Sequence, residues 1–130
     1  GALFPHMTLR ANVAFGLPRE RRGEADAWLA KVGLAGMGAR YPHELSGGQQ
    51  QRAALARAMA PGPQVLLMDE PFASVDIVLR RALRRECRIL LREAGSTVIL
   101  VTHDPAEALD IGDRIAVMEA GRIVQFGTPL

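Results

Sequence analysis

The sequence predicts an α/β fold in which a helical segment, residues 1–62, precedes part of a parallel sheet, residues 63–130. Two short apolar runs, 65–68 and 97–102, are separated by a long helical stretch. A strand, a long helix and a second strand in this order form the crossover unit of a parallel sheet. The turn residues Pro61–Gly62–Pro63 separate this unit from the helical segment. Apolar residues make up 48% of the chain, which is enough for a core.

The first half of the chain reads as three helices joined by loops. Thr8 can cap a short helix that runs to about Phe15. Residues 24–32 have the spacing of an amphipathic helix, and residues 33–44, with four glycine or proline residues, read as a loop. Residues 46–59 form a strong helical stretch. The apolar side of the second helix consists of Ala25, Trp28, Leu29 and Val32.

The second half alternates strands and helices. We expect the strands at 65–68 and 97–102 to be buried on both faces, as is typical of parallel sheets. The helix between them spans residues 76–94, and a short helix follows at 105–111. Residues 114–118 and 122–126 are the arms of a predicted hairpin around a tight connection.

Bulk properties exclude several classes of protein. The net charge of +2 does not by itself indicate a nucleic-acid partner. No apolar run reaches the roughly 20 residues of a membrane span, and no secretory leader pattern is visible. The single cysteine, Cys87, falls at helical spacing with Leu79, Leu83 and Leu90, so we expect it to be a buried apolar residue. Lys31 is the only lysine of the chain. Both ends of the chain suggest that the sequence is a fragment of a longer one.

The segment Leu45–Gln49 can present a helix N-terminus to an anion. Ser46 begins a helix whose first turn, Gly47–Gly48, has no side chains, so backbone N–H groups can approach a phosphate closely. Ser46 and Gln49 also have the spacing of a capping box, which needs no ligand. A cap would not by itself favour two glycines, because each costs roughly 0.5–1 kcal/mol in a helix.

Polar side chains follow both apolar strands. Asp69 and Glu70 end the first, where Asp69 could hold Mg²⁺ through water and Glu70 could orient or deprotonate a water. Pro71 should restrict Glu70 to extended backbone. His103 ends the second strand. If the two strands lie in one sheet, His103 shares an edge with Glu70 and could contact a phosphate or its attacking water. The alternatives are polar strand ends and a plain helix start at His103, with Asp104 as its cap.

The predicted long helix begins at Asp76, which could be a plain N-cap. It carries a basic stripe that could contact nucleic acid or lipid, or form a solvated face paired with Glu86 and Glu93. We favour the solvated face. The stripe consists of Arg80, Arg81, Arg84, Arg85, Arg88 and Arg92.

In order and spacing these segments resemble the nucleotide-binding subunit of ATP-binding-cassette (ABC) transporters over all 130 residues. Leu45–Gln49 is identical to the LSGGQ motif of that family, and Val65–Glu70 is similar to its Walker B strand with the catalytic glutamate. Ala73–Asp76 resembles the D-loop, with Val75 in place of the usual leucine. His103 resembles the switch histidine. The resemblance implies a P-loop NTPase-like ABC ATPase fold, present in part as the helical subdomain with LSGGQ (1–62) and the C-terminal part of the RecA-like core (63–130).

The resemblance also implies roles. The family forms a head-to-tail dimer, in which Ser46, Gly47, Gly48 and Gln49 would contact the ATP held by the partner subunit. Asp69 with Mg²⁺, and Glu70 and His103 as catalytic residues, would act within their own subunit, and Asp76 would lie near the interface. The implied partners are a second nucleotide-binding subunit, permease subunits and, indirectly, a solute-binding protein, with no nucleic acid. The implied location is the cytoplasmic face of the inner membrane, as a peripheral protein.

The lysine-bearing Walker A motif, G-x-x-x-x-G-K-[ST], does not occur in the sequence, and the Q-loop glutamine should lie before Gly1. We therefore expect no ATP turnover by the 130 residues alone. Within the ABC family, the subgroup whose sequences are most similar to this chain imports ferric iron, polyamines or sulfate. Two alternatives stay open, which are an ABC-type ATPase acting on DNA or the ribosome and a non-catalytic interaction fragment.

Overall fold

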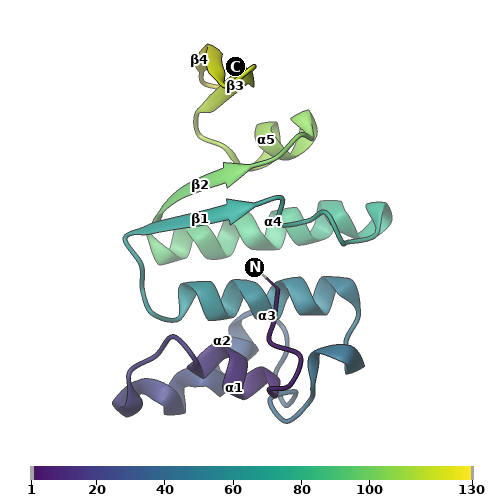
Figure 1. Cartoon of the computed structure of the whole chain (residues 1–130), viewed down its shortest axis with the longest axis vertical. Helices are drawn as coiled ribbons and strands as arrows, with labels where there is room; N and C mark the ends of the chain where they lie inside the picture. The colour runs from purple at the N-terminus through teal and green to yellow at the C-terminus, as the bar shows by residue number, and fades with distance from the viewer. Residues whose placement is uncertain (1, 130) are drawn as a thin grey trace.

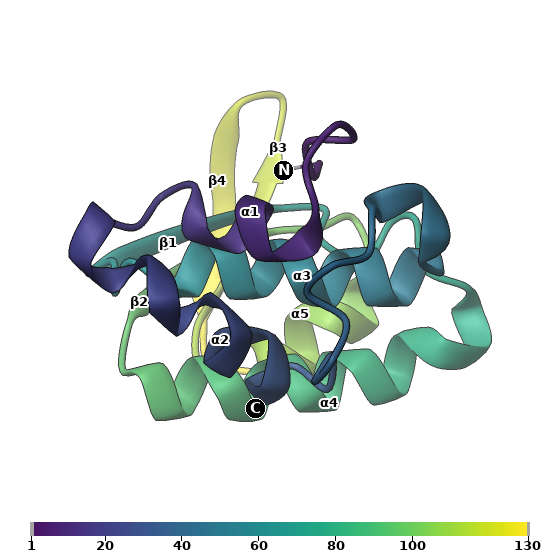
Figure 2. The same cartoon turned by 90° about the horizontal axis from the view of Figure 1, so that it is seen from below.

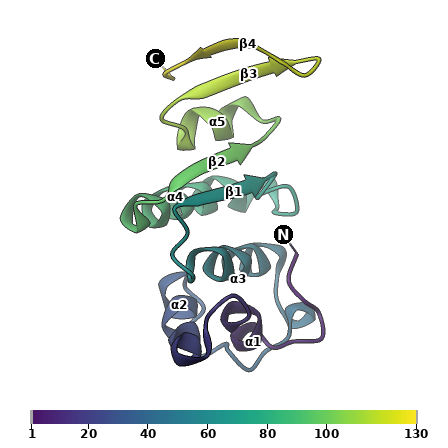
Figure 3. The ribbon, with the colours of Figure 1, turned by 60° about the vertical axis from the view of Figure 1, so that its left-hand side comes forward.

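A computed structural model describes residues 2–129, and it stacks the elements in layers (Figure 1). Three helices form one end, a strand–helix–strand unit follows, and a hairpin forms the other end (Figure 3). The helices are α1 (Leu9–Ala14), α2 (Ala25–Lys31), α3 (Gly47–Met59), α4 (Ile77–Ala94) and α5 (Pro105–Ile111), with 3₁₀ turns at Arg19–Glu24 and Pro42–Glu44. The strands are β1 (Val65–Asp69), β2 (Thr97–Val101), β3 (Ile115–Glu119) and β4 (Arg122–Gly127).

The helical end is fixed by caps and by one buried amide. The Thr8 hydroxyl accepts a hydrogen bond from Ala11 N at 3.2 Å and starts α1, as predicted. Asn12 is fully buried, and its side chain bonds both the N–H (2.8 Å) and the carbonyl (3.1 Å) of Phe4. These bonds satisfy a buried amide that would otherwise be costly, and they fasten the N-terminal segment to α1.

Two apolar cores meet at α3. One side of α3 packs against α1 and α2 (Figure 2), and the other side contributes Leu55 and Met59 to a second core with β1 and α4. Trp28 is half-buried and packs against both cores, with Lys31 Nζ 4.2 Å from its ring centroid. The predicted apolar side of α2 is confirmed, because Ala25, Leu29 and Val32 are all buried in the first core.

The β1–α4–β2 unit has the predicted parallel pairing, with Asp69 opposite Val101. The prediction that both faces of these strands are buried is wrong. Leu66 is buried in the second core, whereas the neighbouring Leu67 is 72% exposed, and Ile99 and Val101 on β2 are also exposed. Successive side chains of a strand point to opposite faces, and only the face toward the second core is covered in residues 2–129.

Helix α4 begins and ends where the sequence predicted. Asp76 Oδ1 accepts from Val78 N at 3.2 Å, and Gly95 ends the helix with φ 69°, a left-handed conformation that glycine adopts easily. Cys87 is 2% exposed, and burial raises the pKa of its thiol to about 12, so it behaves as an apolar core residue. Leu79, predicted on the same face, is instead 56% exposed and is not part of the second core.

The hairpin of β3 and β4 is antiparallel, as predicted, and Glu119 pairs with Arg122. Its two-residue connection has positive φ at both Ala120 (50°) and Gly121 (78°). This is the combination that a tight hairpin turn of type I′ requires. Within residues 2–129, no helix is both long and apolar enough to cross a lipid bilayer.

Candidate functional site

Four chain segments converge on one side of the molecule. The carboxyl ends of β1 and β2 and the N-termini of α3 and α4 all lie at this side (Figure 1). The loop that follows β1 touches the start of α3, because a Cβ built on Gly47 would lie 2.8 Å from the carbonyl oxygen of Ser74. The loop that follows the predicted acidic strand end therefore lies against the predicted anion-binding helix start.

The α3 N-terminus is a complete capping box. Ser46 Oγ accepts from Gln49 N at 3.2 Å, and Gln49 Oε1 accepts from Ser46 N at 3.0 Å. The structural alternative for this motif is thus confirmed. Ser46 and Gly47 are also exposed, so the remaining first-turn N–H dipoles lie at the surface.

The two glycines of this turn have different explanations. At Gly47 a Cβ would collide with the backbone of Ser74, so packing within the chain requires glycine there. At Gly48 a Cβ would meet nothing within 4 Å among the described residues, and the φ of Gly48 is not positive. Nothing in residues 2–129 therefore accounts for glycine at position 48, where alanine would favour the helix.

Glu70 adopts an unusual backbone conformation. Its φ is 47°, in the left-handed region, so the extended geometry expected before Pro71 is wrong. Such a conformation costs on the order of 1–3 kcal/mol for a residue other than glycine. Hydrogen bonds hold it there, because Glu70 N donates to Val101 O at 2.8 Å and its Oε1 accepts from His103 N at 3.0 Å.

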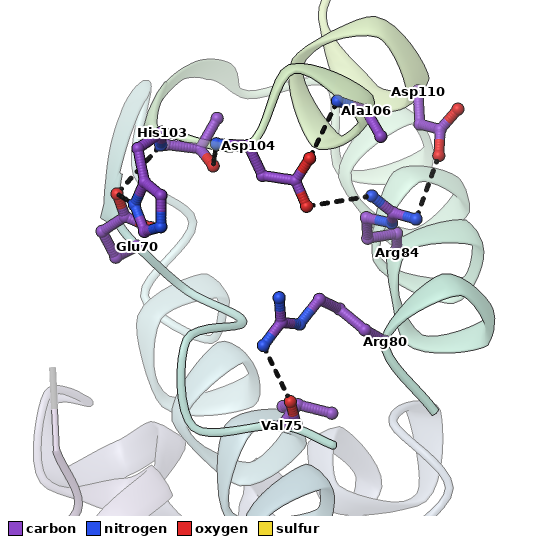
Figure 4. Close-up of polar contacts among 9 residues, drawn as sticks. Glu70, Val75, Arg80, Arg84, His103, Asp104, Ala106 and Asp110 are labelled. Carbon is purple, nitrogen blue, oxygen red and sulfur yellow. Dashed lines mark hydrogen bonds and ion pairs between the residues drawn. The ribbon is translucent and has the colours of Figure 1, made fainter. Parts of the chain in front are cut away.

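Glu70 and His103 form a direct pair across the two strand ends (Figure 4). His103 Nδ1 lies 2.6 Å from Glu70 Oε1, which confirms that the two residues share one edge of the sheet. The His103 side chain is 85% exposed and that of Glu70 is 32% exposed, so solvent or a ligand can reach both. The hydrogen bond and the charge of Glu70 raise the pKa of His103, with smaller contributions from Asp104 and Glu107.

This pair predicts a pH dependence that the Glu70→Gln substitution should remove. The raised pKa of His103 stabilises the folded chain at pH values below 6.5, the pKa of histidine in the unfolded chain. This stabilisation is lost as the pH rises through the higher pKa of His103 in the folded chain. In the 130-residue chain, which has three histidines, an NMR titration should find a His103 pKa above 6.5, and a lower one in Glu70→Gln. Glu93→Gln is the control variant, because Glu93 is exposed on α4 and no ion pair of Glu93 is found within residues 2–129. An unchanged His103 titration in Glu70→Gln would contradict the pairing.

Asp69 is exposed at the last position of β1, next to Glu70. No group of three or more possible metal ligands occurs among residues 2–129. Magnesium bound to nucleotides usually takes only one or two protein carboxylates, and phosphates and waters complete its shell. A single accessible carboxylate fits that pattern, whereas it would not fit a metal site built from protein alone.

The capping alternatives for two further residues are confirmed. Asp76 caps α4, as described above. Asp104 caps α5, with its Oδ1 accepting from Ala106 N at 2.9 Å and Pro105 at the first helical position. Both caps hold backbone segments that border the site, so a structural role and a role at the site are compatible.

The arginine stripe of α4 is not the uniform solvated face that we expected. Arg84 is only 9% exposed and lies near Asp104 and Asp110, while Arg92 pairs with Asp113 at 2.6 Å. Glu86 pairs instead with Arg52 of α3, at 2.8 Å, and no ion pair of Glu93 is found within residues 2–129. Sequence spacing placed the carboxylate partners of these arginines on α4 itself, whereas the fold supplies them from α5 and its flanking turns.

The fold matches a known class of protein. A dimeric structure of the ATP-binding cassette MJ0796 in a post-hydrolysis state, bound to ADP and Pi, superposes with a TM-score of 0.78 and 33% identity. The match covers 98% of this chain and 59% of that chain. The fold is therefore the P-loop NTPase-like α/β fold of ATP-binding cassettes, present in part. The chain belongs to the ABC transporter family, whose model matches residues 1–73.

Import proteins are prominent among its curated relatives. The Fe(3+) ions import ATP-binding protein FbpC of Pseudomonas fluorescens is 53% identical over 100% of this chain. The sulfate/thiosulfate import ATP-binding protein CysA of Nocardia farcinica is 56% identical over 98% of it. The spermidine/putrescine import ATP-binding protein PotA of Pseudomonas fluorescens is 52% identical over 99% of it. The chain spans 38%, 40% and 37% of these relatives, respectively.

Proposed function

We propose that this chain supplies two parts of an ATP-hydrolysing ABC import subunit. The first is helix α3 with the LSGGQ motif, called the signature helix below, and the second is the set of residues that activate the attacking water. Residues 1–62 would be its helical subdomain, and residues 63–130 the C-terminal part of its catalytic core. The identity to three import ATP-binding proteins over nearly the whole chain supports this assignment. Their names cover ferric iron, polyamines and sulfate, so we propose a solute of one of these kinds.

The observation that carries the proposal is Gly48. A glycine that weakens the first turn of a helix, with open space where its Cβ would lie, is explained when a ligand approaches the backbone there. The exposed helix start favours an anion. We propose that Ser46, Gly47, Gly48 and Gln49 contact the γ-phosphate of an ATP held by a partner subunit, and that Asp76 lies near the same interface.

The strand-end residues would act within their own subunit. Asp69 would hold Mg²⁺, through water, beside the ATP phosphates, where the ion offsets phosphate charge. Glu70 would orient the attacking water and accept its proton, and its position 2.6 Å from His103 supports a shared task. His103, with a pKa raised by Glu70, would present a proton to phosphate oxygens.

Splitting the site between subunits makes hydrolysis conditional on assembly. Phosphoryl transfer depends mostly on positioning and charge stabilisation, so neither half of such a site is active by itself. We propose a dimer of nucleotide-binding subunits that closes on ATP and thereby moves attached permease subunits, with a solute-binding protein acting through the permease. The complex would place this chain at the cytoplasmic face of the inner membrane.

The test is whether this chain completes an ATP site that another subunit begins. ATP should be titrated into the 130-residue chain, into a family subunit with an intact lysine loop, and into their mixture. We expect weak binding to the chain, because it lacks the loop that cradles the phosphates, and tighter binding to the mixture than to the subunit. The control is the chain with Gly48→Asp, whose added carboxylate should repel the phosphates and remove the gain. A mixture no tighter than the subunit would refute the proposal.

A further inference from the structure

Two arginines of α4 connect the loop after β1 to the turn that carries His103 (Figure 4). Arg80 and Arg84 are four residues apart, so they lie on one face of the helix, about 6 Å apart along its axis. The helix itself is anchored in the second core through Leu83, Cys87 and Leu91. A rigid element thus carries both guanidinium groups.

Arg80 contacts the loop that leads from β1 to α4. Its Nη2 donates to the carbonyl oxygen of Val75 at 3.0 Å. Val75 is buried, and it directly follows Ser74, whose carbonyl lies against Gly47 at the start of α3. Arg80 therefore fixes the loop segment that packs against the signature helix.

Arg84 contacts the turn between β2 and α5. Its Nη1 lies 3.8 Å from Asp104 Oδ2, and its Nη2 lies 3.6 Å from Asp110 Oδ2. Asp104 directly follows His103, whose backbone N–H and ring both bond Glu70. Arg84 therefore acts on His103 through the capping residue next to it.

Burial makes this arrangement more than a surface ion pair. Arg84 is 9% exposed, and Glu107, from α5, is 3% exposed. Arg80 Nε, Arg84 Nε and Nη1, and Glu107 Oε1 are buried without a hydrogen-bond partner. A buried charge is costly unless it is compensated, so the Arg84 guanidinium depends on Asp104 and Asp110, whose side chains are 31% and 53% exposed. Burial raises the pKa of Glu107, and the charges of Arg84 and Arg80 oppose that rise.

We propose that Arg80 and Arg84 are positioning residues that hold the Ser74–Asp76 loop and the His103 turn in fixed relation to each other across α4. This inference rests on the proposed function. It makes the Ser74–Asp76 loop, which would face the partner subunit, move as one unit with Glu70 and His103, which would activate the water. Neither arginine contacts Glu70 or His103 directly, so both act through the position and charge of neighbouring residues and take no part in the reaction itself.

Three variants test the role of Arg84. Arg84→Gln removes the charge, and Asp104→Asn removes its partner while keeping a good helix cap, since asparagine caps as well as aspartate. Arg85→Gln is the matched control, because Arg85 is exposed on the same helix and has no ion pair within residues 2–129. Should Arg84→Gln fail to fold by circular dichroism, the kcat of Asp104→Asn, compared with that of Arg85→Gln, decides the question.

The first measurement is the His103 pKa by NMR in the 130-residue chain. Asp104 raises the pKa of His103, so loss of Arg84 should raise it further by leaving Asp104 uncompensated. Asp104→Asn should lower it, and Arg85→Gln should leave it unchanged. An Arg84→Gln titration like that of Arg85→Gln would overturn the inference, whether or not the protein hydrolyses ATP.

The second measurement is ATP turnover by the full-length gene product. Arg84→Gln and Asp104→Asn should each lower kcat about tenfold with KM unchanged, because small misplacements of reacting groups are costly. The double variant Arg80→Gln/Arg84→Gln should lower kcat by less than the product of the fold-reductions measured in the two single variants, because both arginines act on one unit. Independent losses, or a kcat like that of Arg85→Gln, would overturn the inference. A wild type without turnover would instead refute the proposed function.

Discussion

Replacing Glu70 by Gln in the full-length gene product should lower kcat for ATP hydrolysis by about 10²–10⁴-fold, the usual contribution of a general base. Glutamine matches the shape of glutamate but cannot accept the proton of the attacking water. The site is otherwise intact, so ATP should still bind and still close the dimer. Steady-state phosphate release and the ATP dissociation constant, measured on the same preparation, separate chemistry from binding.

Glu93→Gln is the control for this prediction. Glu93 is exposed near the end of α4, with no ion pair found within residues 2–129, so its loss should leave turnover unchanged. A Glu70→Gln protein that hydrolyses ATP at the wild-type rate would show that another group activates the water. Turnover by the 130-residue chain alone, abolished by Glu70→Gln, would contradict our expectation that the chain needs a second subunit.

Gly48→Ala should change stability and activity in opposite directions. The new methyl group meets open space, and alanine favours a helix over glycine by up to about 1 kcal/mol, so the unfolding free energy of the chain should rise. The same methyl group stands where a phosphate would approach the backbone, so turnover by the full-length gene product should fall, on the order of tenfold or more. Urea unfolding and phosphate release measure the two effects.

Gly47→Ala is the matched comparison one residue earlier. Its methyl group would lie 2.8 Å from the Ser74 carbonyl oxygen, so the loop or the helix must shift, at a cost of about 1–3 kcal/mol. Gly47→Ala should therefore destabilise the chain, whereas Gly48→Ala should not. If Gly48→Ala left turnover at the wild-type rate, a ligand would not be the reason for glycine at that position.

The order and type of the elements were predictable because local signals agreed with the final packing. Thr8, Ser46, Asp76 and Asp104 each cap the helix that the sequence placed after them. Proline and glycine marked the breaks, and Gly121 with its neighbour marked the hairpin turn. These signals act within about four residues, so they operate largely irrespective of the rest of the chain.

The site was predictable as a set of residues but not as a geometry. Parallel pairing predicted that Glu70 and His103 share an edge, and they lie 2.6 Å apart. The left-handed backbone of Glu70 was not predictable, because Pro71 favours the opposite and the bonds to Val101 and His103 override that preference. Arg84 gave no signal to distinguish it from the exposed arginines of α4, since its partners come from a helix about twenty residues further along the chain.

By itself, the sequence determined the helices, the strands, their ends and the motifs of an ABC nucleotide-binding protein, because caps, turns and apolar spacing are local interactions. Only the tertiary structure decided which arginine is buried, which of the two glycines packing requires, and which strand face is covered. Those outcomes depend on distant segments meeting in space, and the free energy of burying a charge or a methyl group is set by what it meets there.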